Sequence, residues 1–210
     1  MPTFDRTAEN FHLLHLFSLT AMRTYPFLSL AAAMLLTVAC NKDNTDPDGL
    51  VSATQEGKNT GDFLVNGVPF GPRSRVSTPA DKPVKAYWSH SNQGQATIEI
   101  TFFREDDNKK VRSLDVMVAS IKQPRTYLLI DLINPYTVIG AKSSGRYTLP
   151  FTSPTFQPIY LTGPTARGEV IITRYDTTAH VISGTFEAKL REYQGPDSLY
   201  ITKGRFDCTF

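Results

Sequence analysis

Residues His180–Arg191 read His-Val-Ile-Ser-Gly-Thr-Phe-Glu-Ala-Lys-Leu-Arg and decide the fold class. From Ile182 to Leu190 every second residue is apolar or glycine, and those between are polar or charged. A period of two is typical of a β-strand that buries one face and exposes the other. We therefore expect Phe186 and its alternate neighbours to face a core, and Glu187 and its alternate neighbours to face water.

The same alternation extends outward on both sides, and no stretch after residue 61 repeats apolar residues with a helical period. It predicts further strands over residues 62–65, 68–70, 84–90, 96–104, 111–121, 126–133, 169–175 and 198–210. Asn66-Gly67 is typical of a type I′ hairpin turn, and Gly204 indicates a bulge. We expect a single all-β domain over 61–210, with about 8–10 antiparallel strands in a β-sandwich or a partly open β-barrel.

The stretch from Asn134 to Pro164 interrupts this pattern with five prolines among aromatic residues. Proline lacks the N–H that a sheet needs, which favours loops and edge strands. Rings on loops above a rigid frame can stack on sugars or peptides. The candidate ligand-binding residues are Tyr136, Tyr147, Phe151, Phe156 and Tyr160. The alternative is that these rings cover the open end of the domain as core.

The segment from Met22 to Ala39 reads as a secretory signal, with a cationic start, a short apolar run and small residues before Cys40. Thr37-Val38-Ala39-Cys40 resembles the lipobox of bacterial lipoproteins, which implies lipidation of Cys40 and anchoring in a membrane. Residues 1–21 carry acids that a signal avoids, so we expect translation to start at Met22 and 1–21 to be a mis-assigned extension.

Residues 40–60 follow as the lipidated cysteine and a polar segment that predicts a flexible tether. Asp43, Asp46 and Asp48 lie close to Cys40. This acidic run resembles the export signal of Bacteroidota lipoproteins. The resemblance implies an outer-membrane lipoprotein, either periplasmic or surface-exposed.

Charge and composition narrow the chemistry. The 210 residues carry 22 basic and 20 acidic side chains without a basic block, which argues against a nucleic-acid partner. With 2 Cys and 4 His there is little material for a metal centre, and we expect neither metal nor cofactor. His90 and His180 read as separate surface residues. Cys208, at period two between Phe206 and Phe210, is expected to be a buried, inert thiol.

Three short motifs resemble the signature of a family of small Bacteroidota lipoproteins with an all-β domain of unknown function. They are Gly57-Lys58-Asn59-Thr60 leading to Val65-Asn66-Gly67, then Ile182-Ser183-Gly184-Thr185-Phe186, then Ile201-Thr202-Lys203-Gly204-Arg205-Phe206-Asp207. Turn glycines and alternating strands carry no chemistry, so the resemblance implies no catalytic residue.

Two further motifs match the short O-glycosylation pattern of secreted Bacteroidota proteins. They are Asp176-Thr177-Thr178 and Asp197-Ser198-Leu199, both on predicted turns. Thr177 and Ser198 are therefore candidate sites of modification.

The sequence favours a lipid-anchored domain with a non-catalytic binding or scaffolding role, its ligand a glycan or a peptide. One alternative is an envelope enzyme acting on glycans with a carboxylate pair, for which Glu99, Glu169 and Glu187 are the strand-borne acids. Another is a subunit of a surface complex, which an exposed apolar patch would mark. The oligomeric state stays open.

Overall fold

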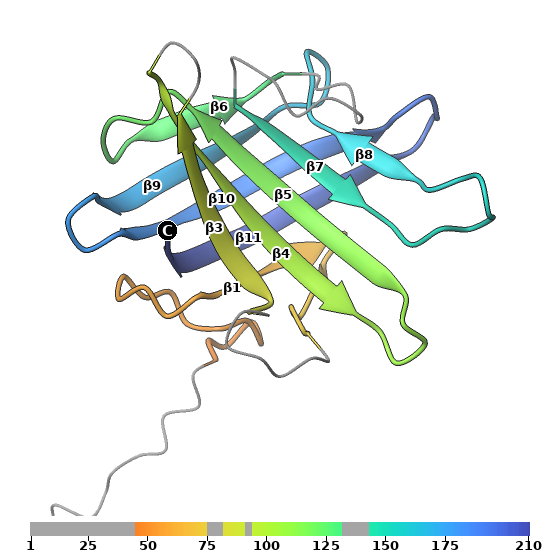
Figure 1. The fold of residues 1–210 in the computed structure, drawn as a ribbon. Helices are drawn as coiled ribbons and strands as arrows, with labels where there is room; N and C mark the ends of the chain where they lie inside the picture. The colour runs from red at the N-terminus through yellow and green to blue at the C-terminus, as the bar shows by residue number, and fades with distance from the viewer. Residues whose placement is uncertain (1–44, 75–81, 91–93, 132–142) are drawn as a thin grey trace, which may run out of the picture. The chain divides into compact units, whose positions relative to one another are not determined.

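The computed structural model describes residues 45–74, 82–90, 94–131 and 143–210. Within these ranges the chain forms no helix, and its eleven strands join in one antiparallel sheet (Figure 1). None of these residues forms a helix with the length and apolarity needed to cross a membrane. The predicted extension over 1–21, the signal over 22–39 and Cys40 lie outside the described residues.

The observed strand bounds agree closely with those predicted from the alternation. The two strands that the sequence did not predict are β7 and β8. The strands are β1 (Thr60–Val65), β2 (Val68–Pro69), β3 (Val84–His90), β4 (Ala96–Glu105), β5 (Val111–Ala119), β6 (Thr126–Leu129), β7 (Ser144–Thr148), β8 (Ile159–Leu161), β9 (Gly168–Asp176), β10 (Val181–Glu192) and β11 (Ser198–Thr209).

The sheet folds back on itself at β10. Its order is β2-β1-β11-β10-β8-β7-β5-β4-β3, and β6 and β9 branch from β10. The first part of β10 pairs with β9, whereas its last residues, Arg191 and Glu192, pair with β8. The front layer of β3, β4, β5 and β7 thereby crosses the back layer of β9, β10 and β11 (Figure 1). The sheet does not close into a barrel. The predicted all-β, antiparallel fold is confirmed.

Phenylalanine rings join the two layers. Phe102 of β4 lies 5.2 Å from Phe63 of β1 and 5.3 Å from Phe186 of β10, measured between ring centroids. All three side chains are buried, as the alternation in β10 predicts for Phe186. Burying such a ring contributes about 1.5–3 kcal/mol to stability. The core therefore lies between the layers.

Two motif glycines allow the strands to approach closely. A Cβ on Gly184 would lie 2.3 Å from the carbonyl oxygen of Ile171, and one on Gly204 would lie 2.5 Å from the ring of Phe186. The register of β10 against β11 shifts between Phe186 and Ala188, beside Gly204, which confirms the predicted bulge. Each of these glycines is therefore required by packing.

Residues 45–59, which we call the N-terminal strap, pack against β11. Leu50 is completely buried, and the guanidinium of Arg205 forms ion pairs with Asp46 and Asp48. The expectation of a flexible tether over 40–60 is therefore wrong for the described residues from 45 onward. The polar residues of the strap have partners on a strand that is distant in sequence, and composition alone cannot reveal such partners.

Asp207 joins the three sequence motifs that begin at Gly57, Ile182 and Ile201. Its carboxylate accepts hydrogen bonds from the backbone N–H groups of Gly57 and Lys58 at 2.7 and 3.2 Å. The hydroxyls of Thr54 and Ser183 donate to it at 2.5 and 2.8 Å. Ser183, which the alternation assigns to the solvent face, is buried by these contacts. The three motifs thus have a common structural role.

Candidate functional site

The rings proposed from sequence as ligand contacts do not form one surface. Tyr147 of β7 and Tyr160 of β8 are opposite each other in the sheet and are 2% and 6% exposed, so the prediction is wrong for these two. The described part of the stretch contains the short strands β7 and β8, with Pro150, Pro154 and Pro158 in the connection between them and Pro164 after β8. Phe151 and Phe156, in the connection from β7 to β8, are exposed. Tyr136 lies outside the described residues.

The two candidate glycosylation residues differ in exposure. Thr177 is exposed in the turn from β9 to β10, where Asp176 accepts hydrogen bonds from the N–H groups of Thr178 and Ala179. Ser198 is the half-buried first residue of β11, opposite Arg191. Thr177 is thus the more accessible of the two hydroxyls.

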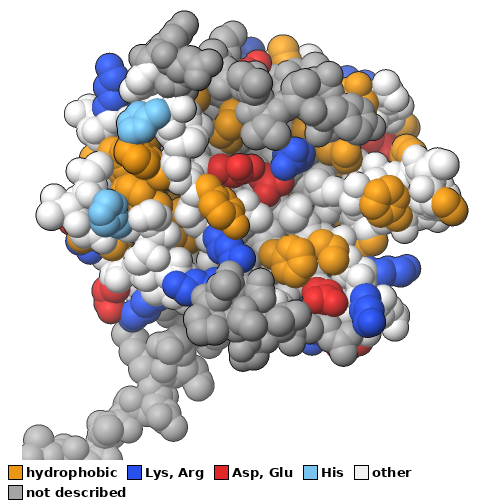
Figure 2. Space-filling model, viewed as in Figure 1, with side chains coloured by type: hydrophobic (Ala, Val, Ile, Leu, Met, Phe, Trp, Pro, Cys, Tyr) orange, Lys and Arg blue, Asp and Glu red, His pale blue; other side chains and the backbone are white. Residues whose placement is uncertain are grey.

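Polar and aromatic side chains gather on the outer face of the front layer. Figure 2 shows acidic side chains at the centre of this face, beside Lys or Arg and hydrophobic side chains. The register explains this grouping: Tyr87 of β3 lies opposite Glu99 of β4, and Thr101 of β4 lies opposite Asp115 of β5. Asp115 in turn lies opposite Arg146 of β7.

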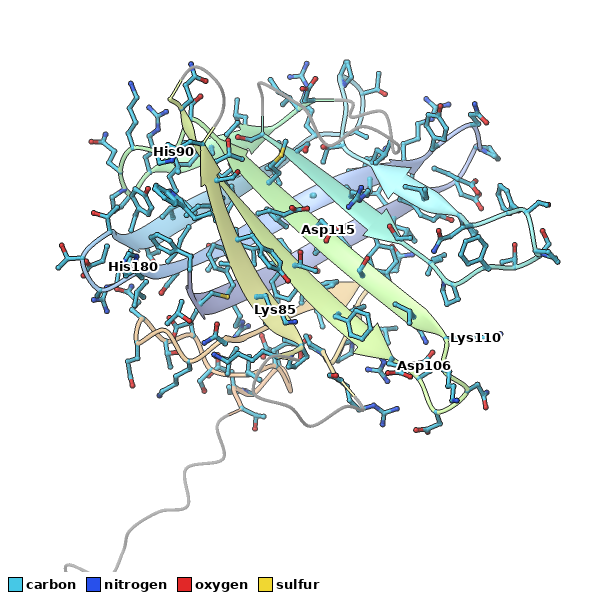
Figure 3. All side chains as sticks on the ribbon, viewed as in Figure 1. Lys85, His90, Asp106, Lys110, Asp115 and His180 are labelled. Carbon is cyan, nitrogen blue, oxygen red and sulfur yellow. The ribbon has the colours of Figure 1, made fainter. Side chains whose placement is uncertain are left out.

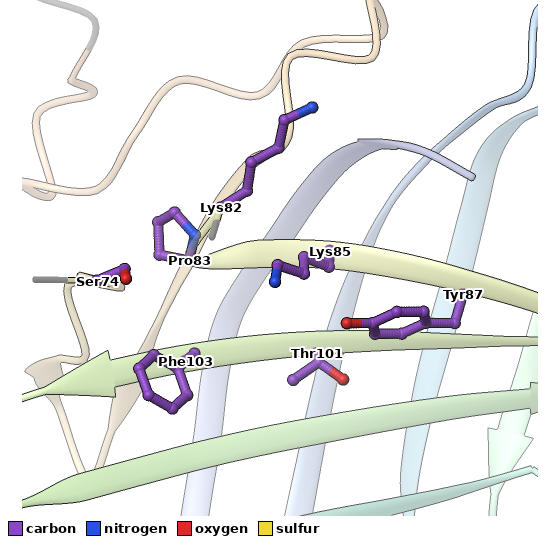
Figure 4. Close-up of a pocket in the computed structure, with 7 residues that line it drawn as sticks. All are labelled: Ser74, Lys82, Pro83, Lys85, Tyr87, Thr101 and Phe103. Carbon is purple, nitrogen blue, oxygen red and sulfur yellow. The ribbon is translucent and has the colours of Figure 1, made fainter. Parts of the chain in front are cut away.

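Beside these residues the face is hollowed by a small pocket of about 160 Å³, which we call the front pocket. Lys85 and Thr101 lie between the rings of Tyr87 and Phe103, and Pro83 continues the lining (Figure 4). Ser74 and Lys82 complete it. Tyr87 is 53% exposed, so its ring is available to a ligand. The pocket therefore combines apolar rings with cationic and hydroxyl groups.

Asp115 is held rigidly at the centre of the front layer (Figure 3). Its Oδ2 accepts hydrogen bonds from Nε and Nη2 of Arg146 at 3.0 and 2.9 Å, and its Oδ1 accepts one from the hydroxyl of Thr101 at 3.0 Å. Because both oxygens are engaged, this carboxylate has a structural part in positioning Thr101 and Arg146.

The carboxyl of Glu99, unlike that of Asp115, has no hydrogen-bond partner in the described residues. Burial and the negative charge of Asp115 raise the pKa of its carboxyl above the ordinary value, against a smaller lowering effect of Arg146. Among the residues that the structure describes, no side chain or backbone group makes a hydrogen bond or ion pair with the carboxylate of Glu99. A half-buried acceptor without a partner is a suitable anchor for a ligand hydroxyl or amide. The alternation identifies Glu99 as one of three strand-borne acids but does not reveal its half-burial beside Asp115.

The other two strand-borne glutamates lie on the back layer. Glu169 and Glu187 are opposite each other on β9 and β10 and are exposed. Both line two shallow hollows of about 460 and 410 Å³ on the outer face of that layer. The structure therefore brings Glu169 and Glu187 together and separates them from Glu99.

The two histidines, treated in sequence as separate, belong to one aromatic cluster. His90 lies 4.1 Å from Trp88, and His180 lies 5.7 Å from Phe210, measured between ring centroids. Figure 3 places both histidines at the same side of the domain. In the described part of the chain, no group of three or more His, Cys, Asp or Glu side chains is arranged to hold a metal ion.

Cys208 is a buried, free thiol, as the sequence predicts. Burial and the neighbouring Asp207 raise the pKa of this thiol to about 12. A thiol of this pKa is protonated at neutral pH and is a poor nucleophile. Cys208 therefore belongs to the packing of β11 and not to a reactive site.

Comparison with known proteins adds no relative to these observations. No protein-family model, no curated protein and no solved structure matches the chain.

Proposed function

We propose that this chain is a lipid-anchored, non-catalytic binding domain of the bacterial cell envelope, with the front pocket as its ligand-contact surface. Lipidation of Cys40 and residence at the outer membrane are supported by the signal over 22–39 and by the lipobox-like residues before the cysteine. The ligand is a glycan or a peptide, because both offer apolar faces together with hydroxyl or amide groups.

The observation that carries the proposal is the placement of Tyr87 beside Glu99. The phenol ring of Tyr87 is about half exposed, whereas the carboxylate of Glu99 opposite it is half-buried and has no partner among the described residues. A ligand stacked on the ring can donate a hydrogen bond to this carboxylate. Both groups stand on central parts of paired strands, so little conformational entropy is lost on contact.

The chemistry of the described groups favours binding over catalysis. The oxygens of Asp115 are engaged by Arg146 and Thr101, which leaves Glu99 without a second free carboxylate beside it. Glycoside hydrolysis requires two carboxyl groups free to act on the same bond. The exposed pair of Glu169 and Glu187 on the back layer is the alternative that an enzyme would use.

The test is a glycan and peptide array probed with the full-length chain, in a detergent without a sugar headgroup. We expect Tyr87→Ala and Glu99→Gln each to weaken binding of the captured ligand by about tenfold or more. Tyr200→Ala is the matched control, because Tyr200 on β11 is also 53% exposed but lies on the back layer. Equal binding by the Tyr87→Ala and Tyr200→Ala chains would refute the front pocket.

Turnover of an arrayed substrate would refute the non-catalytic role. If it occurred, Glu169→Gln and Glu187→Gln would show whether the back-layer pair is responsible.

The anchor is tested separately by intact-mass analysis of protein extracted from membranes. We expect a mature chain that begins at lipid-modified Cys40, and a Cys40→Ala chain that is neither cleaved nor acylated. A mature terminus upstream of Cys40 would overturn the lipoprotein assignment without bearing on the front pocket.

A further inference from the structure

A row of aromatic rings lies along the open side of the domain, away from the front pocket. We call it the aromatic strip and define it as Trp88, Phe210 and Tyr175, with His90 and His180 at its ends. The ring centroids of Trp88 and Phe210 are 6.5 Å apart, and those of Phe210 and Tyr175 are 5.7 Å apart with planes inclined by 21°. Figure 2 shows hydrophobic side chains between two histidines on this side.

The strip exists because the sheet stays open. Trp88 lies opposite Ile98 in the register, so its ring points to the same side of the front layer as that fully buried residue. Trp88 is nevertheless 45% exposed, because β3 is an edge strand of the sheet. No strand among the described residues pairs with the free edge of β3. An inward-facing tryptophan thereby becomes a surface ring.

The strip is held by the backbone. The N–H of Phe210 donates a hydrogen bond of 2.9 Å to the carbonyl oxygen of His180, which fixes the last residue of the chain beside the turn from β9 to β10. His180 itself has a φ of 53°, a conformation that is uncommon for residues other than glycine.

We propose that the aromatic strip is a second binding site, for the pyranose rings of a neutral oligosaccharide. A pyranose presents an apolar C–H face, which stacks on an exposed aromatic ring, and a rim of hydroxyls, which need donors and acceptors at the side. Trp88 supplies the largest exposed ring. The imidazoles of His90 and His180 supply the donors and acceptors at the two ends.

The composition of the strip distinguishes this ligand from others. None of the side chains of the strip is a carboxylate, a lysine or an arginine, so these side chains offer no fixed charge to a charged polymer. Its polar side-chain groups are the two imidazoles, the indole N–H of Trp88 and the phenol of Tyr175, which suit hydroxyls. The site differs from the front pocket in its residues and in the face of β3 that it uses, so either can fail without the other.

Trp88 is the one tryptophan of the whole chain, and its emission therefore reports on the strip directly. The experiment is a fluorescence titration of the full-length chain, in a detergent without a sugar headgroup, with cellohexaose, maltohexaose and mannohexaose as probes. We expect a saturable change of emission with at least one of them. Phe210→Ala and Tyr175→Ala, which keep the reporter, should each weaken this binding by about tenfold.

Phe103→Ala in the front pocket and Tyr200→Ala on the back layer are the controls, and both should leave the titration unchanged. Circular dichroism of every variant shows whether the fold is kept, and His90→Gln serves as a milder change if Phe210→Ala fails to fold. Emission that stays constant with all three probes would overturn the proposal. So would binding that survives Phe210→Ala, or emission that changes with protein concentration alone, which would assign the strip to contact with a second copy.

Discussion

The carboxylate of Asp207 accepts a hydrogen bond of 2.7 Å from the backbone N–H of Gly57, 150 residues earlier in the chain. Two residues before Asp207, the guanidinium of Arg205 binds Asp46 and Asp48 of the same N-terminal strap. These contacts fasten the start of the domain to its last strand. The strap and β11 should therefore unfold together, and Asp207 should contribute strongly to stability.

The first prediction concerns this carboxylate. Asp207→Asn replaces one of two acceptor oxygens by an NH₂ group that faces donors of the strap. We expect a loss of about 2–4 kcal/mol in the free energy of unfolding, since hydrogen bonds to charged groups contribute about 1.5–3 kcal/mol each and are not additive. Urea denaturation of the full-length chain measures it. Asp197→Asn, at an exposed turn, is the control and should change stability by less than about 0.5 kcal/mol.

The second prediction concerns pH. Burial raises the pKa of the Asp207 carboxyl, but hydrogen bonds from Thr54, Gly57 and Ser183 outweigh burial, so its pKa lies below the ordinary 3.8. As the pH falls through 3.8, the carboxyl of Asp207 is protonated in the unfolded chain before it is protonated in the folded chain. The free energy of unfolding therefore decreases. The advantage of the wild type over Asp207→Asn should thus be complete above about pH 5 and shrink below about pH 4. An advantage that stays constant between about pH 7 and pH 2.5 would contradict this assignment.

The third prediction concerns the close approach at Gly184. Its Cβ in Gly184→Ala would lie 2.3 Å from a backbone oxygen of β9, which cannot move without breaking the pairing of β9 and β10. We expect a loss of about 3 kcal/mol, at the upper end for overpacking. Gly145→Ala is the control, because the nearest atom to its Cβ is at 3.4 Å, an ordinary contact. Thermal denaturation of both variants measures their stability. Similar losses of stability in the two variants would refute the role given to Gly184.

The fourth prediction concerns the thiol of Cys208. In a Cys40→Ser chain it is the one remaining cysteine. Because the side chain is fully buried and the pKa of its thiol is about 12, we expect no alkylation by iodoacetamide at about pH 8 in the native state. Labelling should become complete in about 8 M urea. Native labelling at the rate of a free thiol would show that β11 opens readily.

Part of the candidate sites was foreseeable from the sequence, and part was not. The alternation of β10 predicted the burial of Phe186, and period two predicted the burial of Cys208. The strands that carry Tyr147 and Tyr160 have 5 and 3 residues, too few for a period to show among prolines. Their rings were for that reason assigned to loops, whereas both lie buried in the sheet.

The sequence by itself determined the all-β class, the hairpin at Asn66-Gly67 and the bulge beside Gly204, because each depends on residues that are neighbours along the chain. Only the tertiary structure decided which residues meet: Asp207 with the N-terminal strap, and Trp88 with Phe210. Cross-strand register and the packing of two layers are set by pairs far apart in the chain. The period of a strand carries no information about which strand it will face.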